Sequence, residues 1–170
     1  SWMDIPALLA TTGSAFVAKD DLAGSAIFRF LAALNDTVFI ARDQRSTVST
    51  QVEYVRQAVA GDGALTIFID GTTGDGTGLL PFKSALLSAL EPLPEGLIVQ
   101  PVLLRYAEGP RIAWVGEEPG AANIKRMLGR FRPIRLDLHF LDPLAGDALL
   151  NRKTMAGAAR DAIAARMALG

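Results

Sequence analysis

The sequence has no cysteine and a single histidine, His139. The absence of cysteine excludes disulfides, thiol nucleophiles and cysteine-ligated zinc, and it fits a reducing compartment. One histidine also excludes a multi-histidine metal site within this chain, so we expect no bound metal. His139 is the one imidazole available as a general base, but it alternates with apolar residues in a predicted strand. A half-exposed structural position is therefore the preferred interpretation of His139.

The chain also lacks an excess of positive charge and a long apolar run. Its 170 residues carry a formal net charge of −1, which argues against nucleic acid as a partner. Mean hydropathy is high at +0.27, yet no window holds the roughly 18 uninterrupted apolar residues of a membrane-spanning helix. The opening Ser1-Trp2-Met3-Asp4 shows neither a basic segment nor an initiating methionine. We expect it to be a cut inside a longer protein.

What the sequence does contain is an alternation of strand-like and helix-like segments. Strands are predicted at 15–18, 37–41, 64–69, 97–106 and 133–141, and helices at 2–10, 20–35, 46–59, 83–91, 121–130 and 151–169. Residues 111–115 are expected to pair with 97–106 as a hairpin, and Pro101 marks that strand as an edge or a bulge. The alternation predicts an α/β fold: a single domain over residues 1–170, with a mainly parallel mixed sheet flanked by helices.

The last predicted helix has a start signal and an apolar stripe. Asn151 is a suitable N-cap residue. The expected core positions are Met155, Ala159, Ile163 and Met167.

Charged residues follow three of the apolar strands, namely Lys19, Arg42 and Asp70. If these strands are parallel neighbours, the three side chains gather at one edge of the sheet, where α/β proteins bind ligands. Lysine and arginine there suit a phosphate or a carboxylate. The alternative is that each residue ends its strand in solvent.

A glycine-rich loop follows the third strand, from Phe68 to Lys83. Glycines at such a place let backbone N–H groups approach an anion. The nucleotide-binding patterns are not met, because Gly76 is followed by Thr77-Gly78 instead of a lysine, and Leu79 stands where a dinucleotide fingerprint has its third glycine. Nucleotide binding is therefore a weak hypothesis, and a plain surface loop is the alternative to a site.

A basic cluster with apolar residues among the cations lies in the last third of the chain. Its members are Lys125, Arg126, Arg130, Arg132 and Arg135, with Met127, Leu128 and Phe131 between them. Such a segment suits an anionic membrane surface, where each cation contributes about 1 kcal/mol. A solvated helix end whose cations match the helix dipole is the alternative.

Four ordered blocks resemble those of the 1-acylglycerol-3-phosphate O-acyltransferase (lysophospholipid acyltransferase) family. Ser1-Trp2-Met3-Asp4 matches the end of a His-x-x-x-x-Asp block, whose histidine would stand two positions before Ser1. The second block corresponds to Lys19-Asp20-Asp21-Leu22 and Phe39-Ile40-Ala41-Arg42. The third is Phe68-Ile69-Asp70-Gly71-Thr72, and the fourth is Gln100-Pro101-Val102. The resemblance extends over nearly the whole chain and implies a glycerolipid acyltransferase-like fold.

Some positions depart from the family pattern. Asp70 replaces the usual glutamate, which shortens the side chain by one methylene, and Ile69 replaces the usual proline. Asp21 replaces a second glutamate. The block's histidine is absent from the chain, so we expect these 170 residues to be inactive alone.

The resemblance implies acyl transfer from a thioester to a lipid hydroxyl, in phospholipid biosynthesis. The family's histidine acts as general base, and Asp4 is the carboxylate that orients it. By the same resemblance Lys19 and Arg42 hold the acceptor's phosphate, while Asp70, Gly71 and Thr72 shape the glycerol-binding floor. The acyl donor is acyl-CoA or acyl-carrier protein, used as a co-substrate with no bound cofactor.

The first interpretation of the acceptor is lysophosphatidic acid, converted to phosphatidic acid at the cytoplasmic face of the bacterial inner membrane. A lyso-ornithine-lipid acyltransferase is close behind, because the Gly71-Thr72-Thr73-Gly74-Asp75-Gly76 loop also resembles that branch. A non-catalytic lipid-binding relative is the competing class, and Ile69 and Asp70 lend it some support.

Overall fold

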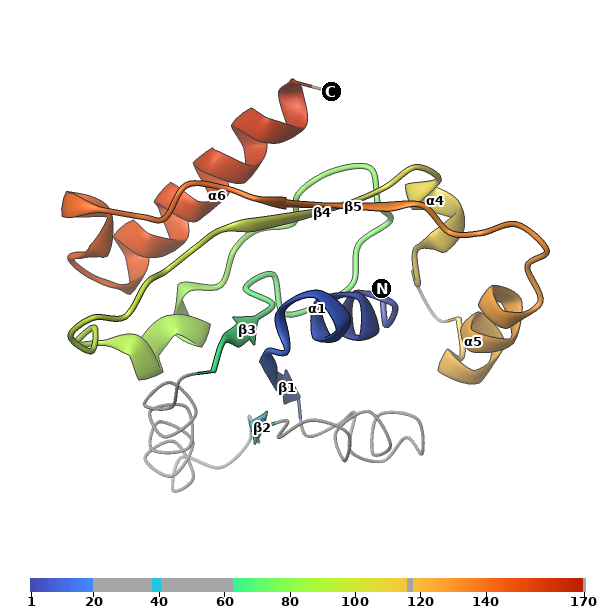
Figure 1. Ribbon diagram of the computed structural model, residues 1–170, viewed down its shortest axis with the longest axis horizontal. Helices are drawn as coiled ribbons and strands as arrows, with labels where there is room; N and C mark the ends of the chain where they lie inside the picture. The colour runs from blue at the N-terminus through green and yellow to red at the C-terminus, as the bar shows by residue number, and fades with distance from the viewer. Residues whose placement is uncertain (20–37, 41–62, 116–117, 170) are drawn as a thin grey trace. The chain divides into compact units, whose positions relative to one another are not determined.

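The computed structural model describes residues 1–19, 38–40, 63–115 and 118–169 (Figure 1). The chain forms two compact units. The N-terminal unit consists of Met3–Ile69 and Lys83–Leu97, and the C-terminal unit consists of Ser1–Trp2, Asp70–Phe82 and Ile98–Gly170. The helices predicted at 20–35 and 46–59 lie outside the described residues.

A parallel three-stranded sheet organises the N-terminal unit. The strand β1 (Ala15–Lys19) is central, with β2 (Val38–Ile40) on one side and β3 (Leu65–Ile67) on the other. Both pairings are parallel. The carboxyl ends of all three strands therefore lie at the same edge, as the alternation of helices and strands predicts.

The core of this unit lies around β1. Phe16 is 1% exposed, and its ring stacks on that of Phe68 with 6.2 Å between the centroids and 10° between the ring planes. Leu8 contributes from α1 (Asp4–Thr12), and Leu87 and Leu90 are buried residues of the 3-10 helix η3 (Ser84–Leu90). Each fully buried side chain of this size stabilises the fold by about 1.5–3 kcal/mol.

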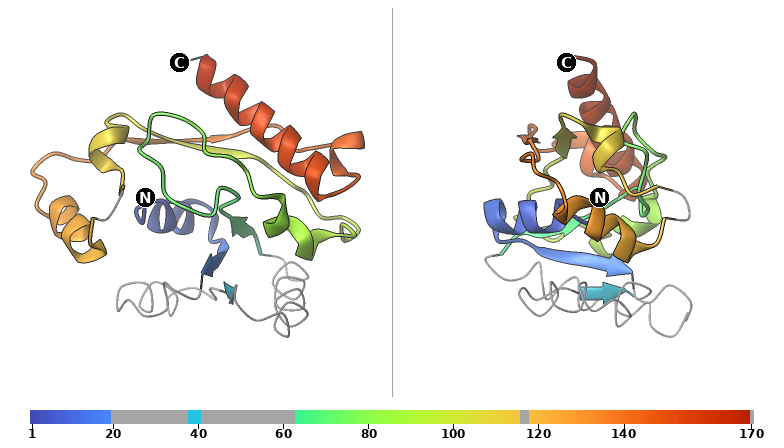
Figure 2. Two further views of the ribbon diagram at one scale, coloured as in Figure 1. Left: turned by 180° about the vertical axis from the view of Figure 1, so that it is seen from behind. Right: turned by 90° about the vertical axis from the view of Figure 1, so that its right-hand side faces the viewer.

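The C-terminal unit is built on an antiparallel pair, β4 (Val102–Tyr106) and β5 (Leu136–Phe140). The helix α6 (Arg152–Ala168) packs on β4 after the short 3-10 helix η4 (Gly146–Leu149). In Figure 2 α6 lies beside the β4–β5 ribbon, and α5 (Gly120–Leu128) is at the other end of this unit.

The start and the core face of α6 follow from its sequence. Asn151 is the N-cap, and its side-chain oxygen accepts from the N–H groups of Lys153 and Thr154 while Thr154 completes a capping box. This confirms the predicted cap. Met155 and Ile163 are buried as expected, at 1% and 8% exposure. The buried set also includes Ala156, whereas the other two predicted stripe residues, Ala159 and Met167, are only half-buried.

The predicted hairpin is wrong. Residues 109–112 form the short helix α4 (Gly109–Ile112), and the partner of β4 is β5. Pro110 explains the difference, because its fixed φ suits the first turn of a helix and it has no N–H for a strand ladder. The strand predicted from residue 97 begins at Val102, directly after Pro101, which likewise cannot donate.

The prediction of a single, mainly parallel mixed sheet is correct only in part. The described residues form an α/β arrangement with two separate sheets, one parallel and one antiparallel. The two sheets share no ladder among the described residues. No helix in the described part of the chain is long and apolar enough to cross a membrane.

Candidate functional site

The carboxyl edge of the parallel sheet carries Lys19, the first residue of the second sequence block. Lys19 is the last residue of β1, and its backbone is in register with Ile40, the last residue of β2. Arg42 follows Ile40 by two residues and lies outside the described residues. The parallel register thus confirms that Lys19 and the end of β2 share one sheet edge, which is where α/β proteins bind ligands.

Asp4 is the first residue of α1, the helix that precedes the central strand. A carboxylate in the first turn is stabilised by the unpaired N–H groups of the helix N-terminus. At its other end α1 stops at Gly13, which adopts a φ of +63° and donates its N–H to the Leu9 carbonyl. Glycine reaches this left-handed conformation without the steric cost that a side chain would bring.

A buried serine joins α1 to the sheet. Ser14 is 1% exposed, and its hydroxyl contacts that of Thr66 on β3 at 2.9 Å and that of Thr12 at the end of α1. Its N–H also donates to the Thr12 hydroxyl at 3.2 Å. The helix that carries Asp4 is therefore fixed to the sheet by hydrogen bonds as well as by packing.

The third block divides into a structural half and an exposed half. Phe68 stacks on Phe16 in the core, so this aromatic position is explained by packing. The carbonyl of Ile69 accepts the N–H of Lys83 at 2.8 Å, which closes the base of the loop Asp70–Phe82. Beyond that base the side chains of the block become accessible, with Asp70 half-buried and Thr72 exposed.

The glycines of the loop Asp70–Phe82 have backbone roles. Gly71 and Gly76 adopt φ values of +63° and +78°. A Cβ atom on Gly76 would lie 2.8 Å from the carbonyl carbon of Gly109, so no larger residue fits there without displacement. The glycine content is thus accounted for by left-handed turns and a close backbone approach.

Asp75 is held within its own turn. Its carboxylate accepts the Thr77 hydroxyl at 2.6 Å and the Thr77 N–H at 2.9 Å. These hydrogen bonds, with that of the hydroxyl the stronger cause, lower the pKa of Asp75 below its ordinary value. Asp75 is a turn-forming residue and not a candidate for proton transfer.

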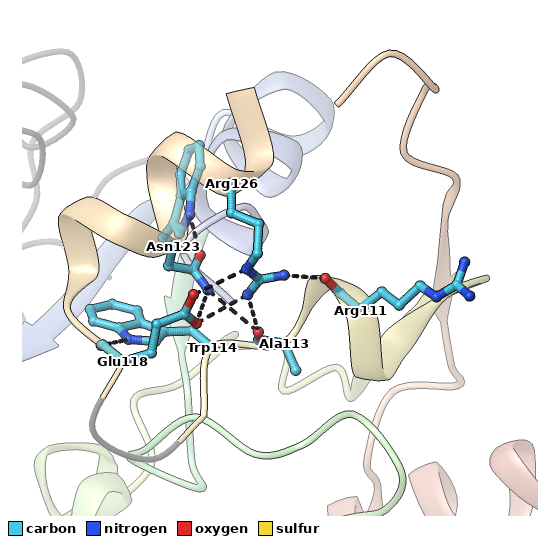
Figure 3. A network of polar contacts seen from close by, with 7 residues as sticks. Arg111, Ala113, Trp114, Glu118, Asn123 and Arg126 are labelled. Carbon is cyan, nitrogen blue, oxygen red and sulfur yellow. Dashed lines mark hydrogen bonds and ion pairs between the residues drawn. The ribbon is translucent and has the colours of Figure 1, made fainter. Parts of the chain in front are cut away.

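A polar network surrounds the fully buried Asn123 in the C-terminal unit (Figure 3). The side-chain oxygen of Asn123 accepts the indole N–H of Trp2 at 3.0 Å. Its side-chain nitrogen donates to the Glu118 carboxylate at 2.8 Å. Because Trp2 stands two residues before Asp4, this network holds the chain directly upstream of the candidate carboxylate.

Arg126 completes the network. Its guanidinium donates to both oxygens of Glu118 at 3.0 Å, to the carbonyl of Ala113 at 3.0 Å and to the carbonyl of Arg111. Figure 3 shows the guanidinium between these acceptors, with the Arg111 side chain directed away from them. The guanidinium and the Asn123 amide hold the pKa of Glu118 below its ordinary value, the Arg126 hydrogen bonds being the larger cause.

The sequence did not reveal this network. Arg126 was grouped with a solvent-facing basic cluster, and nothing in the spacing links Trp2 with Asn123, which are 121 positions apart. The one available signal was an asparagine in the middle of a helical apolar pattern, since such a residue needs side-chain partners when buried.

The predicted site residues therefore fall in two groups. Asp4 and Lys19 belong to the N-terminal unit, and Asp70, Gly71 and Thr72 belong to the C-terminal unit. His139, set aside as structural, is half-buried on β5 with its Nδ1 atom 3.3 Å from the Arg166 guanidinium. Because a guanidinium only donates, this nitrogen acts as an acceptor, which agrees with a structural role.

Comparisons with known proteins identify the family. The model of the Acyltransferase family matches residues 1–105, which include all four sequence blocks. The chain therefore belongs to the Acyltransferase family, as the motifs predicted. No solved structure matches the chain significantly, so the glycerolipid acyltransferase-like fold stays a prediction.

The relatives with curated names act on lysolipids according to those names. The chain is 33% identical to a lyso-ornithine lipid O-acyltransferase of Brucella abortus, over 92% of this chain and 64% of the relative. It is 31% identical to one of Rhodobacter capsulatus, over 98% of this chain and 62% of the relative. A 1-acyl-sn-glycerol-3-phosphate acyltransferase of Neisseria gonorrhoeae is 32% identical over 62% of this chain and 41% of its own length. The chain thus spans about three-fifths of the lyso-ornithine lipid relatives.

Proposed function

We propose that this protein transfers a fatty acyl group from a thioester donor to the hydroxyl of a lyso-ornithine lipid. The observation that carries the choice of acceptor is the extent of similarity. Lyso-ornithine lipid acyltransferases match over 90% or more of this chain, whereas the lysophosphatidic acid enzymes match over 62%. The sequence motifs alone had placed lysophosphatidic acid first.

The chemistry starts with the acceptor hydroxyl, which is too weak an acid to attack a thioester unaided. In the family's first block a histidine removes the hydroxyl proton as the oxygen attacks the thioester carbonyl, and the carbon–sulfur bond then breaks. The imidazolium returns the proton to the leaving thiolate. Asp4 holds the imidazole in the reactive tautomer and stabilises its positive charge.

The remaining candidate residues bind the acceptor. Lys19 and Arg42, at the carboxyl edge of the parallel sheet, bind the anionic part of the headgroup. An ornithine carboxylate suits this pair as a phosphate does, because a guanidinium binds either group with two parallel hydrogen bonds. Asp70, Gly71 and Thr72 form the floor against which the acceptor rests.

Lysophosphatidic acid is the second candidate acceptor, supported by the Neisseria relatives and by the four shared blocks. A direct competition separates the two. The protein carrying the complete first block is given both acceptors at equal concentration with a radiolabelled acyl thioester, and the lipid products are separated. We expect labelled ornithine lipid to dominate, and dominant labelled phosphatidic acid would overturn the choice of acceptor.

The same assay distinguishes an enzyme from a non-catalytic lipid-binding relative. Arg42→Ala should reduce labelled product about a hundredfold, because a charge-assisted hydrogen bond contributes about 1.5–3 kcal/mol. No labelled product with either acceptor, combined with binding of the lyso-lipid, would favour the binding class. Running the reaction with acyl-CoA and with acyl-carrier protein in parallel identifies the donor.

The substrates also suggest a location. Lysolipids reside in bilayers and acyl thioesters in the cytoplasm, so the reaction takes place at the cytoplasmic face of the bacterial inner membrane. Fractionation of cells that express the full protein tests this, with activity expected in the membrane fraction.

A further inference from the structure

Two large apolar side chains protrude from the end of α5. Leu128 is 75% exposed and Phe131 is 106% exposed. They are three residues apart at the helix end, whereas single exposed apolar residues elsewhere in a protein need no explanation. Leaving both in water forgoes the stabilisation that burial of a leucine and a phenylalanine would give.

Leu128 belongs to a helix whose opposite face is buried, and Phe131 follows three residues later, beyond the helix end. Asn123 and Met127 on the inner face of α5 are 0% and 5% exposed. Leu128 therefore points outward, because one residue advances an α-helix by about 100°. The hydrogen bonds of the buried Asn123 and of the exposed Arg126 tie the same helix to Glu118 (Figure 3).

The cations of this segment fall into two kinds. Arg126 pairs with Glu118, and the half-buried Arg130 pairs with Glu108 at 3.3 Å, so both serve the structure. Lys125 and Arg132 are exposed, and among the described residues no ion pair of theirs is found. The exposed cations stand on either side of Leu128 and Phe131 in the chain.

We infer that the patch formed by Lys125, Leu128, Phe131 and Arg132 docks on the surface of an anionic lipid bilayer. Phe131 and Leu128 enter the boundary between headgroups and acyl chains, where interfacial segments bury phenylalanine and leucine side chains. Lys125 and Arg132 remain at the level of the anionic headgroups, which attract cations within a Debye length of the surface. These four residues are called the docking patch.

A bilayer fits these features better than a protein partner does. A specific protein interface buries about 1,200–2,000 Å² with matched shapes, whereas two exposed apolar side chains and two cations offer only a small contact. A fluid interface accepts such a contact without a preformed cavity. The patch also lies outside residues 1–105, the part that the family model matches.

The inference rests on the proposed function in one respect, namely that the acceptor is a lipid. It goes further by identifying the residues through which the protein contacts the membrane. Vesicle binding needs no turnover, and turnover on detergent-dispersed acceptor needs no bilayer. Failure of one can therefore be told from failure of the other.

Co-sedimentation of the 170-residue chain with vesicles tests the patch. One set of vesicles is phosphatidylcholine alone, and the other is equimolar phosphatidylcholine and phosphatidylglycerol. Binding is expected only to the second set. Lys125→Ala with Arg132→Ala should weaken it about thirtyfold, from the usual contribution of each cation near an anionic surface. Leu128→Ser with Phe131→Ser should weaken it at least tenfold.

Matched control variants show whether binding depends on this patch or on any exposed apolar or basic side chain. Leu169 is 80% exposed and Arg160 is exposed on α6, so Leu169→Ser and Arg160→Ala should leave vesicle binding unchanged. Thermal unfolding of every variant verifies that the fold is intact. Equal binding by patch and control variants would overturn the inference, and so would equal binding to neutral and anionic vesicles.

The absence of cysteine allows a second, direct measurement. A single environment-sensitive fluorophore on Phe131→Cys reports the polarity at that position, and the same label on Leu169→Cys is the control. On anionic vesicles we expect a blue shift at position 131 and none at 169. A label that stays in water at 131 overturns the inference. If patch variants instead weaken binding to an acidic acyl-carrier protein and leave vesicle binding unchanged, the partner is a protein and the inference is wrong.

Discussion

The N-terminal unit and the α5 region of the C-terminal unit are stabilised in different ways. Around β1 the core is mainly apolar, with Phe16 stacked on Phe68. Around α5 a buried asparagine is hydrogen-bonded to a partly exposed, bidentate arginine–glutamate pair. Apolar packing tolerates many sequences, whereas a polar network is stable only when every member is satisfied. The candidate residues Asp4 and Lys19 thus belong to a unit whose apolar core should tolerate substitution. Trp2, two residues before Asp4, is instead held by a polar network in which losing one member leaves another unpaired.

The largest expected effect tests the proposed role of Asp4, at the start of α1 in the N-terminal unit. Asp4→Asn should reduce kcat of the protein with the complete first block by about 10⁴-fold, because an amide favours the wrong imidazole tautomer. The fold should persist, since asparagine has the same shape and also suits a helix start. Single-turnover acyl transfer measures the loss, and near-wild-type turnover would remove Asp4 from the proposed mechanism.

The next effect tests apolar packing. Phe16→Ala should lower the free energy of unfolding by about 3–5 kcal/mol, because it removes the stacked ring and leaves a cavity against Phe68. Phe16→Leu should cost clearly less, since it keeps most of the apolar volume. Urea unfolding followed by circular dichroism measures both. Equal losses for the two variants would contradict a packing role.

A smaller effect tests the polar network. Asn123→Ala should destabilise the protein by about 1–3 kcal/mol, because the indole N–H of Trp2 and the Glu118 carboxylate each lose a partner. Trp2→Phe removes the indole donor alone. A double-mutant cycle of the two measures their coupling, which should be favourable, and additive losses would show that the Trp2–Asn123 hydrogen bond contributes nothing.

The smallest effect concerns acid pH. The pKa of Glu118 is lowered in the folded protein, first by Arg126 and then by Asn123. A lowered carboxyl pKa stabilises the fold above the ordinary value near pH 4.5, and this stability disappears as the pH falls through the folded pKa. Thermal unfolding should therefore show a decline below that value. Glu118→Gln should make this decline in stability shallower. Part of the decline should remain in that variant, because Arg130 and Arg111 also lower the pKa of Glu108.

The sequence predicted the local elements better than their pairing. Periodicity and capping signals located α1, α5 and α6, and short apolar runs located β1, β2 and β3. The partner of β4 was not predicted, because Pro110 starts a helix within the segment expected to form the second hairpin strand, and because strand pairing depends on contacts far apart in the chain. The parallel order of β1, β2 and β3 was predictable because these strands are separated in the sequence by segments long enough for crossover connections.

Most residues of the candidate site were predicted from family motifs, and only some from the arrangement of charges and predicted strands. Strand-end charges pointed to Lys19 and Asp70 before any family was considered, and the register of β1 with β2 confirms the edge on which Lys19 stands. Burial of Asn123 and its contact with Trp2 was beyond prediction, because it results from the tertiary fold of residues 121 positions apart. Exposed residues such as Phe131 were visible in the sequence, but their accessibility was not.

The hydrogen bond from the Lys83 N–H to the Ile69 carbonyl has a consequence for how such a protein diversifies. It joins the two ends of the loop Asp70–Phe82 at a fixed base. Lengthening a closed loop costs little, about 0.6 kcal/mol for each doubling of its length. Changes in the length and sequence of this loop can therefore accumulate while the parallel sheet stays intact, except at Gly76, where an added Cβ atom would meet Gly109. Under the proposed function, a chimera that carries the loop of another family member tests whether this one surface segment sets the acceptor preference.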